Sequence, residues 1–123
     1  MRLAKRIFIG AAIWGVLIVT PLYFMEGYYS ARYGGVQPLW YYGFAGVTLA
    51  WQFAYLLCGL DPVRYRPLMP IAMAAKLSFG IAAIILWQTG RTPFDLWLIT
   101  TPDLILVALF FWAWTKTPRT YPA

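Results

Sequence analysis

Hydrophobic residues fill four long stretches of the chain, and short polar breaks separate them. Within the stretches, runs such as 81–87 and 105–112 are apolar at every position, whereas the strands of a membrane barrel alternate apolar and polar residues. A helix needs about 20 mainly apolar residues to cross a bilayer. The pattern therefore predicts an all-α membrane protein with one domain over 1–123 and four transmembrane helices at about 7–25, 39–60, 68–87 and 94–114.

Composition agrees with this reading. Of the 123 residues, 62% are hydrophobic and only 11% are charged, too few for the polar outer surface of a water-soluble domain of this size. The first stretch is longer than the core of a usual secretory signal, and residues 21–26 offer no small-x-small cleavage site, so we expect it to be a retained anchor.

Lysine and arginine predict the orientation. Seven of them lie at the chain ends or in the middle break, and the other two breaks hold only Arg32 and Arg91. By the positive-inside rule, both termini and the 61–67 loop face the cytoplasm of a bacterial-type inner membrane, and the four spans form an up-down bundle. The net charge of +6 is mostly this bias, so membrane lipids are the expected partner of the basic groups and nucleic acid is not.

Aromatic residues gather where the spans meet the headgroups, above all in the segment 28–42. An anchoring belt at the membrane interface explains most of them. The same segment is long enough to fold over the bundle, so an outer pocket for a lipid, quinone or other flat apolar ligand is the alternative.

Small residues predict where helices pack closely. On the second span they recur at every fourth position, at Gly46, Ala50, Ala54 and Cys58. On the third span Ala72, Gly80 and Ala83 share a face with Lys76. Small residues at this spacing let membrane helices approach one another, so the seam on the second span predicts a contact within the bundle or with another subunit, a second copy included.

Three polar residues lie inside the spans: Gln52, Lys76 and Asp103. An ionisable group within a membrane is a candidate for function because its burial is costly. Gln52 and Lys76 lie at the same depth, and Asp103 lies about one helical turn nearer the outer side. Three alternatives follow: Lys76 pairs with Asp103, Lys76 extends to the headgroups beside a neutral Asp103, or the two relay protons or ions.

Thr101 and Pro102 precede Asp103. Proline inside a helix removes a backbone hydrogen bond and kinks it, but Thr-Pro-Asp is also a pattern that begins a helix. The fourth helix is therefore predicted to be kinked, or broken into two half-helices, at Pro102.

The cytoplasmic loop carries Asp61, Arg64 and Arg66 between two prolines. Asp61 can cap the following turn, and the arginines point the same way if the stretch is extended. They suit contact with lipid headgroups or with the carboxylates of a partner subunit.

The chain has no histidine and one cysteine, and its four acidic residues form no pair. These counts give no basis for a metal site, a cofactor or a catalytic constellation.

The layout is similar to that of many small bacterial membrane proteins, DoxX-like ones among them, and this similarity assigns no residue a role. We expect a membrane protein without catalysis of its own, either an accessory subunit of a membrane complex or a binder of an apolar ligand; the alternative is a small oligomeric ion-coupled transporter that uses Lys76 and Asp103.

Overall fold

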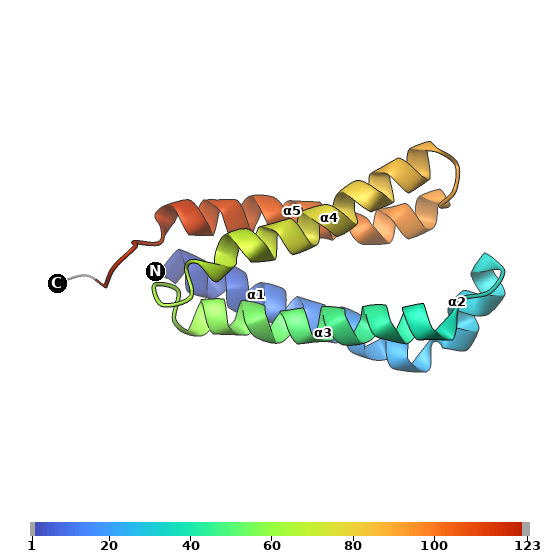
Figure 1. The fold of residues 1–123 in the computed structure, drawn as a ribbon, viewed down its shortest axis with the longest axis horizontal. Coiled ribbons are helices and arrows are strands. Elements are labelled where there is room, and N and C mark those ends of the chain that lie inside the picture. The colour runs from blue at the N-terminus through green and yellow to red at the C-terminus, as the bar shows by residue number, and fades with distance from the viewer. Residues whose placement is uncertain (1, 122–123) are drawn as a thin grey trace.

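The protein is all-helical over residues 2–121, which are the residues that the computed structural model describes, and this range contains no strand (Figure 1). Four of its helical segments are long and apolar enough to cross a membrane. The elements, in chain order, are α1 (Arg2–Val19), the 3₁₀ helix η1 (Thr20–Phe24), α2 (Glu26–Tyr33), α3 (Pro38–Leu60), α4 (Leu68–Gln88) and α5 (Phe94–Lys116).

Local chemistry explains where several of these elements begin and end. Pro21 stands where α1 gives way to η1, since proline cannot donate the hydrogen bond that would continue the α-helix. Gly34 ends α2 with a φ of 80°, a left-handed conformation that glycine adopts without strain. Gln37 begins α3, because its side-chain oxygen accepts a hydrogen bond of 2.7 Å from the amide of Leu39.

Side chains on the outside of the bundle are those that lipid tolerates. Large apolar residues are more than half exposed on every long helix, and in water such a surface would be unfavourable. The most exposed include Leu17, Phe24, Trp40, Val47 and Ile105.

The long helices associate in two pairs, α1 with α3 and α4 with α5. Glycine permits the close approach in each pair. A Cβ at Gly59 of α3 would lie 2.5 Å from Cγ1 of Ile9 in α1, and a Cβ at Gly80 of α4 would lie 2.5 Å from Cδ2 of Leu104 in α5. Van der Waals packing of this kind is what holds membrane helices together.

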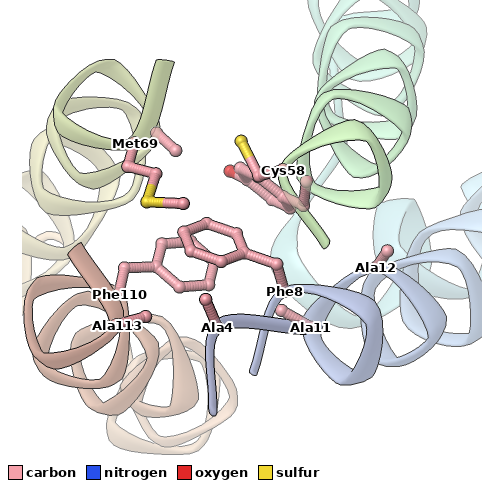
Figure 2. Close-up of a cluster of buried hydrophobic side chains, with 10 residues drawn as sticks. Ala4, Phe8, Ala11, Ala12, Cys58, Met69, Phe110 and Ala113 are labelled. Carbon is pink, nitrogen blue, oxygen red and sulfur yellow. The ribbon is translucent and has the colours of Figure 1, made fainter. Parts of the chain in front are cut away.

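The two pairs meet around one apolar core at the end of the molecule where both chain ends lie, here called the terminal end (Figure 1). The rings of Phe8 and Phe110 stack there with centroids 4.3 Å apart, and Met69 and Cys58 close the cluster from the other two helices (Figure 2). Towards the opposite end, here called the α2 end, the pairs diverge (Figure 1). The only buried residues of α5 are accordingly Phe110 and Ala113, close to the terminal end.

Of the two alternatives predicted at Pro102, a kink or a break, the break into two half-helices is wrong, because α5 is continuous from Phe94 to Lys116 with Pro102 inside it. Pro102 cannot donate to the carbonyl of Leu98, one turn earlier. The hydroxyl of Thr101 donates to that carbonyl instead, at 2.7 Å. The threonine next to the proline thus supplies the missing hydrogen-bond donor, and the helix needs no interruption.

The predicted seam on α3 does not form one internal contact. Cys58 is buried, Gly46 and Ala54 are half-buried, and Ala50 is exposed. A row of every fourth residue drifts around a helix of 3.6 residues per turn, so it cannot stay against one straight neighbour. The face of α3 that is buried contains Ala45, Gln52, Tyr55, Cys58 and Gly59. On α4, by contrast, Ala72, Gly80 and Ala83 are buried on one face with Lys76, as predicted.

Candidate functional site

Lys76 and Asp103 form an ion pair between α4 and α5, with Nζ 2.9 Å from Oδ1. The packing of this helix pair explains the contact. Gly80 lies against Leu104, so Lys76, one turn before Gly80, comes within reach of Asp103 despite their different depths. The predicted ion pair is therefore present, and Lys76 does not extend to the headgroups. A relay of protons or ions through the two residues stays a prediction.

The ammonium of Lys76 also faces an aromatic ring. Nζ lies 5.2 Å from the ring centroid of Tyr55 on α3, a distance at which a cation is attracted to the ring face. Lys76 is 8% exposed, and its charge is therefore compensated by one carboxylate and one ring rather than by water.

Gln52 completes the cluster but does not bond to Lys76 within the described part of the chain. Its Nε2 donates to the carbonyl of Thr48 at 2.8 Å, and its Oε1 is buried without a partner among residues 2–121. Because the Thr48 carbonyl can only accept a hydrogen bond, the amide nitrogen of Gln52 faces it and the amide oxygen points away. Oε1 stands 1.7 Å from where a Cβ would lie at Gly15, so the absence of a side chain at Gly15 makes room for this glutamine between α3 and α1.

A cavity of about 580 Å³ lies between the diverging helix pairs, and the polar cluster forms its closed end. All four long helices contribute to the wall. The apolar part includes Trp14, Ile18, Phe44, Phe79 and Ile99, and the closed end is made by Thr48, Gln52, Lys76, Thr100, Pro102 and Asp103. A cavity of this size, mostly apolar with a few polar groups at one end, is the usual form of a small-molecule site.

The aromatic segment of the sequence lines the same cavity at the α2 end, through Tyr29, Tyr33 and Tyr41. Two of their hydroxyls are already engaged, because Tyr41 donates to the carbonyl of Leu22 at 2.6 Å and Tyr33 donates to Asp95 at 3.2 Å. Burial raises the pKa of Tyr29 above its ordinary value. The cavity therefore meets aromatic surface, rather than free charge, at this end.

A second, smaller hollow of about 160 Å³ lies on the α3–α4 side of the polar cluster. It shares Gln52, Lys76 and Asp103 with the main cavity and adds Tyr55. The rings of Phe44 and Phe79, 5.3 Å apart, border both spaces. The ion pair consequently borders a cavity on two sides, whereas the apolar core between it and the terminal end is filled by side chains.

An ion pair joins the two halves of the molecule at the α2 end. Arg32 of α2 pairs with Asp95 at the start of α5, and Nε of Arg32 lies 3.1 Å from Oδ2 of Asp95. The hydrogen bond to Asp95 raises the pKa of Arg32 above its ordinary value. The sequence analysis did not predict this contact, although the opposite charges of the two residues at the same end of the bundle were an available signal.

At the terminal end, the loop 61–67 is a series of turns and not the extended stretch that was expected. Asp61 accepts from the amide of Arg64 at 3.4 Å and from the hydroxyl of Tyr121, a bond that raises the pKa of Tyr121. Arg66 donates to the carbonyl of Thr117 at 2.9 Å and lies over the ring of Trp114. Of the three residues predicted to contact headgroups or a partner, only Arg64 is exposed, while the other two hold the C-terminal segment.

Comparison of the chain with known protein families, with curated proteins and with solved structures finds no match.

Proposed function

We propose that this chain is a multi-pass inner-membrane protein that holds a small amphipathic molecule in the cavity between its helix pairs. The observation that carries the proposal is the mostly apolar cavity of about 580 Å³ that ends on Gln52, Lys76 and Asp103. Apolar walls favour a lipid-like body, and a few convergent polar groups fix its orientation.

Access from the lipid supports this reading. Trp14 and Ile18 of α1 and Ile99 of α5 line the cavity, and each is about half exposed. We take this exposure as an opening to the membrane at the α1–α5 boundary, nearer the α2 end. A ligand dissolved in the bilayer would reach the cavity there without crossing water.

The proposal includes no catalysis by this chain. The polar groups at the closed end are one amide, one amine and one carboxylate, and the amine and the carboxylate are paired with each other. An acid and a base that neutralise each other give little basis for general acid–base catalysis. The chain could also serve as an accessory subunit, because Ala50 of α3 is exposed and a small residue lets a helix of another subunit or of a second copy approach closely.

Replacement of Thr48, which lines both hollows, by Phe tests the proposal by filling the cavity. Thr115→Phe is the matched control, because Thr115 is exposed near the terminal end of α5. Protein purified in lipid nanodiscs is extracted, and the retained small molecules are quantified by mass spectrometry. We expect an amphiphile at about one per chain in the wild type and in Thr115→Phe, and its loss in Thr48→Phe. Equal retention by all three proteins, or no specific molecule in any, would contradict ligand binding.

Ion-coupled transport is a second candidate because Pro102 and Asp103 both line the cavity. An ionisable residue that faces an accessible space inside a membrane bundle is a candidate for an ion pathway. Purified protein in sealed vesicles tests it directly. Substrate-independent proton flux that Asp103→Asn abolishes would establish transport, whereas tight vesicles with the wild type would favour binding alone.

A further inference from the structure

We infer that the cavity selects an uncharged molecule whose polar end is a hydroxyl or another neutral hydrogen-bond donor, with its apolar body directed towards the α2 end. This inference rests on the proposed function, and it names the class of ligand that the same cavity would take. Farnesol, an isoprenoid alcohol, represents that class.

The first step concerns which polar atom is open to a ligand. Oδ1 of Asp103 is occupied by Lys76, and Oδ2 makes no hydrogen bond within residues 2–121. The side chain of Asp103 is 27% exposed, whereas that of Lys76 is only 9% exposed. Gln52 has an unpartnered Oε1, but this oxygen is itself buried against Gly15. Among the charged and amide groups of the closed end, the atom open to a ligand is therefore a carboxylate oxygen, which only accepts hydrogen bonds. The neutral hydroxyls of Thr48 and Thr100 also line this end and can accept from the same donor.

The second step concerns the charge of the ligand. Asp103 and Lys76 neutralise each other, so a cationic ligand would leave a net positive charge in a mostly apolar cavity and would compete with Lys76 for the same carboxylate. An anionic ligand would face the open carboxylate oxygen, and the ammonium is already engaged by that carboxylate and by the ring of Tyr55. An unpaired charge in an apolar site is unfavourable, and a neutral donor avoids both costs.

The third step concerns orientation. At the α2 end the hydroxyls of Tyr33 and Tyr41 already donate to groups of the protein itself. The hydroxyl of Tyr29 also lines this end, but a neutral phenol is a weaker acceptor than the carboxylate of Asp103. The remaining wall between the two ends is formed by rings and aliphatic side chains such as Trp14, Phe44 and Phe79. A ligand with one donor therefore gains a hydrogen bond when its polar end reaches Asp103, and its body lies along the rings.

Four probes that share one body and differ only in the polar end test the inference: farnesol, farnesyl methyl ether, farnesylamine and farnesoic acid. Their dissociation constants for the wild-type protein are measured by isothermal titration in one detergent, with correction for partition of each probe into micelles. We expect farnesol to bind about tenfold more tightly than its methyl ether, because the ether keeps the shape and loses the donor. The amine and the acid should bind more weakly than farnesol.

Two variants separate the possible failures. In Thr48→Phe all four probes should lose binding, and retention of binding there would overturn the proposed function together with the inference. In the double variant Lys76→Leu and Asp103→Leu, the preference for farnesol over the ether should fall to about one. If binding depends on the cavity but the alcohol and the ether bind equally, or the amine or the acid binds most tightly, the inferred ligand class alone is overturned. This comparison needs only the wild type, so it remains decisive if the double variant does not fold.

Discussion

Lys76 and Asp103 hold two charges inside an otherwise apolar bundle, and each depends on the other. Even on the mildest scale, a lone charge at the centre of a membrane helix costs roughly 2.5–3.5 kcal/mol. The ion pair at 2.9 Å and the ring of Tyr55 beneath the ammonium offset that cost. The loss of one partner should consequently do more harm than the loss of both.

A double-mutant cycle measures this dependence. Lys76→Leu and Asp103→Leu should each destabilise the protein by about 3–5 kcal/mol, because each leaves a buried charge unpaired, and the double variant should lose much less than their sum. Asp103→Asn should be tolerated better than Asp103→Leu, since it keeps an acceptor for the lysine. Thermal unfolding in detergent gives the values, and additive losses would show that the pair contributes no coupling.

Gly15 provides a second test at the scale of single residues. A Cβ there would lie 1.7 Å from Oε1 of Gln52, whereas a Cβ at Gly10 of the same helix would meet nothing within 4 Å. Gly15→Ala should therefore force the amide off its hydrogen bond to Thr48 and cost about 1–3 kcal/mol. Gly10→Ala should be neutral or slightly stabilising, since alanine favours helix by about 1 kcal/mol over glycine. Equal unfolding temperatures for the two variants would refute the close contact between Gln52 and α1.

At the scale of the element, α5 shows how a proline is accommodated without a break. The hydroxyl of Thr101 donates to the carbonyl of Leu98, the group that Pro102 leaves without its backbone donor. The hydroxyl of Thr115 also donates to a helix carbonyl, that of Trp112, but there an ordinary backbone amide is present four residues on. The hydrogen bond of Thr101 therefore replaces a missing backbone donor, whereas that of Thr115 only adds to one that is present.

Thr101→Val should accordingly cost about 1 kcal/mol of stability in the membrane-like environment, because it leaves the Leu98 carbonyl without a donor. Thr115→Val should cost less. In a Pro102→Ala background, which restores the backbone amide, the cost of Thr101→Val should disappear. Unfolding temperatures of these variants in detergent decide the matter, and an equal cost of Thr101→Val with and without the proline would contradict the compensation.

The sequence was a good guide to the elements themselves. The predicted bounds of the last three spans lie within two residues of α3, α4 and α5, because the length of an apolar run and its polar ends determine where a membrane helix can begin and end. The polar cluster was also identifiable, since charged residues are rare within such runs. What the sequence did not predict depends on how helices face one another: the register of α3 against α1, the pair formed by Arg32 and Asp95, and the divergence that opens the cavity.

At the scale of the whole molecule, these contacts make the two ends of the bundle different. The terminal end is closed by stacked phenylalanines and by Arg66 bound to the C-terminal segment. The α2 end is open between the helix pairs and is joined across α2 and α5 by the pair of Arg32 and Asp95. A cavity that is closed towards one end and opens nearer the other requires such an asymmetry, so the orientation of the bundle decides which leaflet the opening faces.

The distribution of basic residues predicts that direction. Seven lysines and arginines belong to the two chain ends and the 61–67 loop, against two in the other breaks, and the positive-inside rule then places the terminal end in the cytoplasm. A reporter enzyme that is active only outside the cytoplasm should stay inactive when fused after Ala123. It should become active when inserted at Gly34, which is exposed at the end of α2. A second reporter that is active only in the cytoplasm should give the opposite pattern at both sites. If both patterns are reversed, the cavity is open towards the cytoplasm, and a ligand would have to come from the inner leaflet instead of the outer one.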